Sequence, residues 1–257
     1  MSYINDEEFF AEANSRKRTR KVKVAGGAKP TPKPSEVNRV ESKLNAFQPT
    51  PKQWEFIDKI GENIVTFVQA PAGVGKSIVT LWYFCKQYLR DPSLEIIITR
   101  TPAEVGKDKI GFLPNSAAEK CEPHYASTKK LLEQFLGKEK VAADLGKRIH
   151  FTIPNYILGS TLDNKLWLID EAQLLQPIIM KLLLERIGMN TKVVVSGSAT
   201  QIYTGDKDRN GMMDAMNRFF NADGSSRYPD FAKQTFNVDD VMRSGVVKSV
   251  LRAYGDI

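Results

Sequence analysis

The sequence predicts an α/β fold, a mostly parallel sheet with helices on both faces, and two observations support this. Several apolar runs are rich in β-branched residues and do not alternate with polar ones, as is typical of strands buried on both faces. Helical patterns separate most of these runs, which favours a parallel sheet. The strand candidates are residues 64–68, 94–100, 148–153, 166–170 and 192–196. The helical patterns are residues 76–90, about 117–136 and 177–188.

Helix and loop signals mark the two ends of the folded part. We expect folding to begin near Ala46, because Thr50 can cap a helix with Pro51 in its first turn. This helix is expected to run to about Ile60. Residues 222–230 are polar and contain Gly and Ser, which predicts a loop before a last helix over 239–254.

The first 45 residues differ in composition from the rest. They carry ten Lys or Arg against six Asp or Glu, and Arg16–Lys23 alone holds six cations and no acid. A Pro- and Gly-rich stretch follows, whose composition cannot pack a core. We therefore divide the chain into a flexible, disordered basic tail and Pro/Gly linker (1–45) and one domain (46–257). The tail either grips nucleic-acid phosphates or serves only to keep the protein soluble.

Composition excludes several classes of protein. Two cysteines, Cys85 and Cys121, form no C-x-x-C pair, so a disulfide framework is not expected. Two histidines leave little material for a zinc site. The segment 1–12 is acidic, unlike a signal peptide, and no apolar run approaches the roughly 20 residues that span a bilayer. We expect a cytoplasmic protein with no membrane partner.

A glycine loop between the first strand and the next helix predicts a phosphate-binding P-loop. Gly73 and Gly75 let successive N–H groups point into one anion-sized nest, to which the helix N-terminus adds its own N–H groups. Lys76 would bind the β- and γ-phosphates of ATP, and the Ser77 hydroxyl would bind Mg²⁺. The position that usually holds the first Gly of this motif is Ala70. The expected nucleotide-binding residues are Ala70, Pro71, Ala72, Gly73, Val74, Gly75, Lys76, Ser77 and Ile78.

Two acids at the end of the strand candidate 166–170 complete the predicted site. Ligands of open α/β sheets bind outside the carboxyl ends of the strands, where the P-loop also lies. We expect Asp170 to hold Mg²⁺ and Glu171 to orient the attacking water, with the two side chains on opposite faces of the strand. From Lys76 to Asp170 the chain has room for a strand between the P-loop strand and the acidic strand. That spacing favours a single RecA-like P-loop NTPase core.

Five segments in a fixed order carry a family resemblance. The most specific is Gly111–Pro114 (Gly-Phe-Leu-Pro), which lies in the sequence between the P-loop and the acidic pair Asp170 and Glu171. Between about Thr50 and Tyr254, the chain resembles the PhoH-like ATPases of bacteria and phages, which are related to superfamily 1 helicases. The segments are Thr50–Gln53 with the P-loop, Ile98–Glu104, Gly111–Pro114, Gly159–Asn164 leading to Asp170–Gln173, and Asp240–Val247.

The resemblance implies further site residues. Gln53 would read adenine, Gln201 would sense the γ-phosphate, and Arg243 would stabilise the charge on the transferred phosphoryl group. Arg100 would lie at a strand end near the site or a nucleic-acid path. The family usually has Asp where this chain has Ser198, which puts the coupling of hydrolysis to movement in doubt.

The resemblance also implies Mg²⁺-dependent ATP hydrolysis, coupled to single-stranded RNA or DNA in a helicase-like motor. The chain has room for one RecA-like domain only, so an Arg243 that cannot reach its own nucleotide would act in trans in a homo-oligomer such as a ring. Two other functions stay open. One is a nucleotide-binding interaction module with little turnover, and the other is a small-molecule phosphotransferase.

Overall fold

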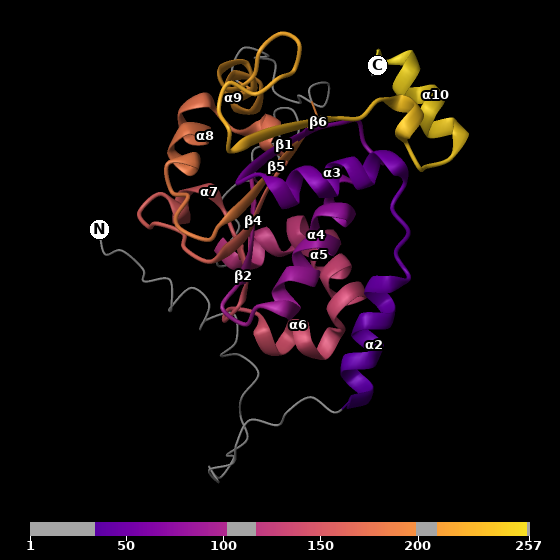
Figure 1. Ribbon diagram of the computed structural model, residues 1–257, viewed down its shortest axis with the longest axis vertical. Helices are drawn as coiled ribbons and strands as arrows, with labels where there is room; N and C mark the ends of the chain where they lie inside the picture. Colours follow the sequence, from indigo (N-terminus) through magenta and orange to yellow (C-terminus); the bar gives the residue numbers. More distant parts are fainter. Residues whose placement is uncertain (1–33, 102–116, 199–209, 256–257) are drawn as a thin grey trace.

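The computed structural model describes residues 34–101, 117–198 and 210–255, and within these ranges the fold is built on one six-stranded sheet (Figure 1). The strands follow the spatial order β3-β2-β4-β5-β1-β6, and every pairing between them is parallel. Their bounds are β1 Val65–Gln69, β2 Glu95–Arg100, β3 Ile149–Thr152, β4 Lys165–Asp170, β5 Lys192–Gly197 and β6 Phe231–Thr235. The predicted fold class is confirmed.

Side chains of each central strand alternate between two apolar cores, one on each face of the sheet. In β4, Leu166 and Leu168 face one core, whereas Trp167 and Ile169 face the other. All four are at most 2% exposed, as expected for strands covered on both sides. The indole N–H of Trp167 donates to the hydroxyl of Thr99 in β2 (2.8 Å), so the buried ring has its polar atom satisfied.

Helices cover both faces, as Figure 1 shows. Residues of α2 to α6 and of α10 join one core, and residues of α7, α8 and α9 join the other. The helices of the first core are α2 Pro34–Asn45, α3 Pro51–Glu62, α4 Lys76–Arg90, α5 Ala117–Leu136, α6 Lys138–Asp144 and α10 Gly245–Ala253. Those of the second are α7 Pro154–Ile157, α8 Pro177–Leu184 and α9 Gly211–Phe219. Two short 3₁₀ helices are η1 Ala172–Leu174 and η3 Val238–Asp240.

The first helix of the structure begins earlier in the chain than we expected from the sequence. Helix α2 occupies the last part of the segment 1–45, which we expected to be a tail and linker. Leu44 is 3% exposed, and its carbonyl accepts a hydrogen bond of 2.7 Å from the indole of Trp82 in α4. This helix is therefore attached to the core. The basic run 16–23 lies outside the described residues.

Two expectations need correction, one about the order of strands and one about the start of the last helix. The strand between the P-loop strand β1 and the acidic strand β4 is β5, which follows both in sequence, rather than one of the strands between them. The last helix begins at Gly245 instead of 239, because residues 238–240 form η3. No helix within the described ranges is long and apolar enough to cross a membrane.

Candidate active site

The loop between β1 and α4 has the backbone geometry of a phosphate nest. Gly73 and Gly75 have φ angles of 92° and 91°, in the left-handed region that favours glycine. Helix α4 begins directly after Gly75, so its first N–H groups face the same space. The ammonium of Lys76 donates to the carbonyls of Ala70 (2.8 Å) and Pro71 (3.0 Å), which folds its side chain over the loop.

Four neighbouring strands end at this loop. The carboxyl end of β5 is next to the start of the loop, where the Ala70 N–H donates to the Gly197 carbonyl (3.2 Å). β4 ends in Asp170, and β2 ends in Arg100, which is the cross-strand partner of Asp170. The parallel sheet therefore brings together residues that are far apart in the sequence.

Asp170 and Glu171 lie in one pocket, and this corrects our expectation that they would point to opposite faces of a strand. β4 ends at Asp170, and Glu171 has a φ angle of 52°, in the left-handed region. This turn takes Glu171 out of the strand alternation and directs its carboxylate into the pocket that Asp170 also lines.

Arg100 is the cation that accompanies the two acids. Its guanidinium lies 3.1 Å from an oxygen of Glu171 and 3.8 Å from an oxygen of Asp170. Burial raises the pKa of Asp170 and the charge of Glu171 raises it further, while Arg100 opposes both effects. Burial also lowers the pKa of Lys76, against the two carboxylates that raise it. We expected Arg100 near the site or along a nucleic-acid path, and in the structure it lies at the centre of the pocket's charged groups.

Gln173 is a residue of the site that sequence reasoning missed. Its side chain is buried, donates a hydrogen bond of 2.6 Å to Glu171 and accepts one of 3.2 Å from the Ser198 N–H. It joins the acidic turn to the end of β5, where a Cβ on Gly197 would lie 2.7 Å from the amide oxygen of Gln173. Among the sequence motifs it appears only as the last residue of the resemblance segment Asp170–Gln173, without a role.

Gln53 contacts the P-loop without lining the pocket. Its amide nitrogen donates to the Val74 carbonyl (2.9 Å), and its amide oxygen accepts from the Thr50 N–H (3.0 Å) in the cap of α3. The residue is 2% exposed. Both ends of the amide are therefore bonded within the protein in this arrangement, although we expected them to face adenine.

Arg243 reaches the P-loop of its own chain. A Cβ on Gly73 would lie 2.8 Å from the Arg243 Cδ, and the Met242 N–H donates to the Gly73 carbonyl (3.0 Å). We expected Arg243 to act in trans only if it could not reach its own nucleotide site. In this structure it does reach that site.

The pocket between these groups has a volume of about 340 Å³, within the range of small-molecule sites. Three residues of α5 close one side, and the sequence did not predict them: Ser127, Thr128 and Leu131. The other lining residues are Ala72, Gly73, Gly75, Lys76, Ser77, Ile78, Arg100, Asp170, Glu171, Gly197, Ser198 and Arg243. Four of the predicted site residues do not line the pocket: Gln53, Ala70, Pro71 and Val74. Gln201 is outside the described residues.

The lining fits a nucleotide with Mg²⁺. The close approach of Arg243 to Gly73 leaves no room for a Cβ in the nest, as expected where a ligand needs backbone N–H groups. Ser77 and Asp170 both line the pocket and supply the hard oxygen donors that Mg²⁺ prefers.

Comparisons with known proteins agree with this geometry. Residues 47–255 match the family described as PhoH-like protein. A PhoH-like protein of Synechocystis is 30% identical over 205 residues, which cover 79% of this chain and 60% of the relative. Protein PhoH of Escherichia coli is 28% identical, with 79% of this chain and 56% of the relative covered. The chain therefore spans less than two thirds of the length of these relatives.

A solved structure supports the fold alone. The ATPase domain of a Thermus phage large terminase, in a mutant form, superposes with a TM-score of 0.50 at 13% identity, over 82% of this chain and 88% of that one. The resemblance drawn from the sequence motifs is confirmed by the family match over most of the chain. This chain belongs to the PhoH-like family.

Proposed function

We propose that this domain binds Mg²⁺-ATP in the pocket at the end of the sheet and hydrolyses it to ADP and phosphate. The observation that carries the proposal is the meeting, in one pocket of one chain, of a P-loop lysine, two carboxylates and an arginine. These are the parts that phosphoryl transfer to water needs: anion binding, metal ligation, orientation of water and stabilisation of charge.

Each residue has a role that its position supports. The Lys76 ammonium would leave the carbonyls of Ala70 and Pro71 and donate to the β- and γ-phosphate oxygens. Mg²⁺, held by Ser77 and Asp170, would withdraw charge from those phosphates. Glu171 would accept a hydrogen bond from the attacking water. Arg243, which comes from the other side of the nest, would stabilise the charge that develops on the transferred group.

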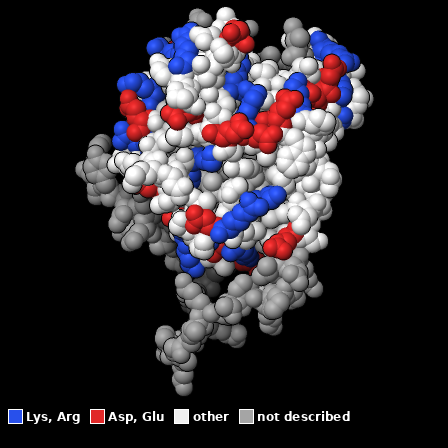
Figure 2. Space-filling view, viewed as in Figure 1, with Lys and Arg blue, Asp and Glu red and all other residues white. Residues whose placement is uncertain are grey.

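We further propose that basal turnover is slow and that single-stranded nucleic acid stimulates it. One oxygen of Glu171 is paired with the guanidinium of Arg100 (3.1 Å), and this ion pair competes with the attacking water for the carboxylate, whereas the amide of Gln173 orients the other oxygen. The face seen in Figure 2 interleaves acidic and basic residues, with an acidic band over α3. The basic run 16–23, with six cations and no acid, is the segment that we propose for contact with the phosphates.

Phosphate release from ATP by the purified full chain tests the proposal. Turnover with Mg²⁺ is expected, its loss with a chelator, and its increase with single-stranded RNA or DNA. Lys76→Ala should lose nucleotide binding, whereas Glu171→Gln should bind a fluorescent ATP analogue and fail to hydrolyse ATP. If the wild type binds ATP but turns over no faster than Glu171→Gln under all conditions, a nucleotide-binding module replaces the proposed ATPase.

Removing the basic run tests the nucleic-acid part separately. A chain in which the six cations of 16–23 are replaced by Gln or Ser should retain basal hydrolysis and lose most of its stimulation. The dependence of stimulation on salt should also weaken, since fewer phosphate contacts are made. Unchanged stimulation would place the nucleic-acid contact on the folded domain.

A further inference from the structure

We infer that Lys52 and Asp240 are positioning residues that hold Arg243 against the P-loop, an inference that rests on the proposed ATP hydrolysis. Neither residue lines the pocket. Their effect on the reaction must therefore pass through the segment between β6 and α10, which carries Arg243 at its far end.

The segment that carries Arg243 has little structure of its own. It consists of η3, one turn of 3₁₀ helix, and a short extended stretch up to Ser244, the residue that precedes α10. Such short turns are marginal without outside support. The segment reaches the P-loop through the hydrogen bond from the Met242 N–H to the Gly73 carbonyl and through the Met242 sulfur, 3.3 Å from the Gln53 amide nitrogen.

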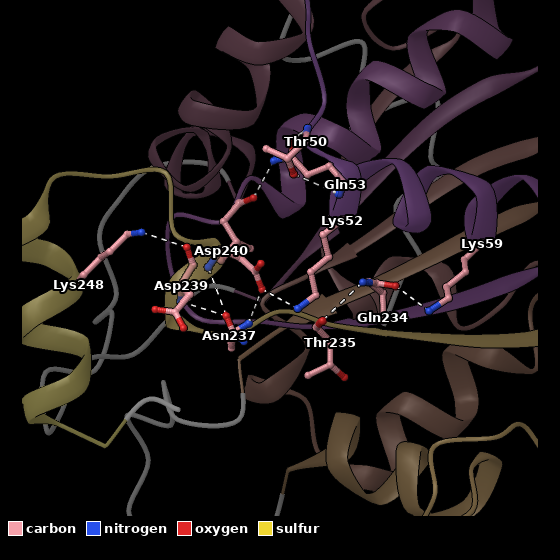
Figure 3. Close-up of polar contacts among 11 residues, drawn as sticks. Thr50, Lys52, Gln53, Lys59, Gln234, Thr235, Asn237, Asp239, Asp240 and Lys248 are labelled. Carbon is pink, nitrogen blue, oxygen red and sulfur yellow. Dashed lines mark hydrogen bonds and ion pairs between the residues drawn. The ribbon is translucent and has the colours of Figure 1, made fainter.

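One carboxylate oxygen ties this segment together, as Figure 3 shows. Oδ2 of Asp240 accepts from the backbone N–H of Asn237 (2.8 Å), which closes the cap of η3, and from the ammonium of Lys52 in α3 (2.8 Å). The Asn237 side chain completes the cap by accepting from the N–H groups of Asp239 (3.0 Å) and Asp240 (3.3 Å). The turn is thus fixed internally and attached to α3 at the same point.

The first turn of α3 holds both sides of the nest. Gln53 holds the P-loop through Val74, and its neighbour Lys52 holds η3 through Asp240. These two contacts act together with the buried Val238 and Val241 to hold the segment that carries Arg243 beside the loop that would bind the phosphates. The Lys52–Asp240 pair is only partly exposed, at 34% and 22% of the two side chains, so solvent screens it less than a fully exposed pair.

The same turn offers a matched control. Asp239, the neighbour of Asp240, also forms an ion pair, at 2.7 Å with Arg252 of α10. That pair is far more exposed, at 77% and 61%, and it does not reach α3. Asp239→Asn and Asp240→Asn therefore remove the same charge from the same turn, and only the second weakens the link to the P-loop side, because a neutral amide oxygen holds the Lys52 ammonium less strongly than a carboxylate does. An Asn at 240 can still accept from the Asn237 N–H, which preserves the cap.

Steady-state hydrolysis of ATP by the full chain is the first measurement. Asp240→Asn and Lys52→Met should each lower kcat by on the order of tenfold, because a catalytic group misplaced by about 1 Å can cost up to a hundredfold. Affinity for a fluorescent nucleotide should change by less than about twofold, and Asp239→Asn should retain kcat within about twofold. An Asp240→Asn variant that behaves like Asp239→Asn overturns the inference.

A second background shows whether the loss acts through Arg243. In an Arg243→Ala protein, adding Asp240→Asn should cause no further loss of kcat, since the residue to be positioned is absent. An equal loss in both backgrounds would mean that Asp240 only stabilises the fold, and the inference would fail.

Hydrogen exchange gives a readout that does not need turnover. The Met242 amide should exchange about tenfold faster in Asp240→Asn than in the wild type, and at the wild-type rate in Asp239→Asn. A wild type without ATPase activity would refute the proposed function, and the exchange of Met242 would then decide the inference by itself. Unchanged exchange in Asp240→Asn would overturn it.

Discussion

Replacing Gln173 by Met separates the orientation of Glu171 from its charge. Met is close to Gln in length and lacks the amide, so the 2.6 Å hydrogen bond to Glu171 and the 3.2 Å bond from the Ser198 N–H are both lost. The residue is 2% exposed, so water cannot freely replace either bond. After the substitution, the Glu171 carboxylate keeps its contact with Arg100 and loses its contact with residue 173.

The expected magnitude follows from the kind of bond removed. A hydrogen bond to a charged group contributes about 1.5–3 kcal/mol. If that energy holds Glu171 in the orientation that the attacking water needs, kcat should fall about 10- to 100-fold, because roughly 1.4 kcal/mol corresponds to a factor of ten. Loss of the buried bond from the Ser198 N–H should also lower the free energy of unfolding by about 1–3 kcal/mol.

Two measurements separate these effects. Phosphate release should show the loss in kcat with nucleotide affinity nearly unchanged, and urea unfolding should show the loss in stability. A Gln173→Met variant that is less stable but hydrolyses ATP at the wild-type rate would refute the orienting role.

Three further predictions concern the loop and the fold. Gly73→Ala should weaken nucleotide binding at least about tenfold in a fluorescence titration, since φ is 92° and the new methyl group would meet an arginine carbon at 2.8 Å. Gly61→Ala in α3 should bind normally, because its new methyl group would make only an ordinary contact with the Tyr83 hydroxyl at 3.7 Å. Gln53→Ala should weaken the binding of ATP and of GTP to the same degree if the residue only supports the P-loop. A loss of affinity confined to ATP would show instead that Gln53 recognises adenine. The hydrogen bond from His150 lowers the pKa of Glu95 to about 2, so Glu95 stabilises the fold above its ordinary value of 4.5 and loses this effect as the pH falls toward 2. Urea unfolding at about pH 6 and about pH 3 should therefore show a smaller loss for Glu95→Gln than for the wild type.

The sequence located the glycine loop and the acidic end of β4 because each depends on local chemistry. Gly73, Gly75 and Lys76 act through backbone geometry and charge at fixed spacing, and an apolar strand that ends in Asp170 is recognisable without neighbours. The end of β2 at Arg100 was equally clear, since β-branched residues fill the strand. What could not be read was that Arg100 and Asp170 are cross-strand partners, because strand order is a property of the whole sheet.

The parts that were missed depend on tertiary contacts. β6 (Phe231–Thr235) has only one buried residue, Gln234, so its sequence shows neither an apolar run nor a clear alternation. The left-handed turn at Glu171 is uncommon for a residue other than glycine and is invisible in a strand pattern. The amide of Gln53 satisfies the cap of α3 and the P-loop, and its direction follows from packing rather than from the residue type.

The arrival of Arg243 at its own Gly73 has a consequence for how copies of the protein behave when mixed. All the groups assigned to the reaction belong to one polypeptide, so the rate per molecule should be independent of protein concentration. Two impaired variants, Lys76→Ala and Arg243→Ala, should show no more activity in a mixture than the sum of their separate activities, and an impaired copy should not lower the activity of wild-type copies. Under the proposed function, each molecule is therefore expected to act as a complete catalytic unit, whatever assembly it joins.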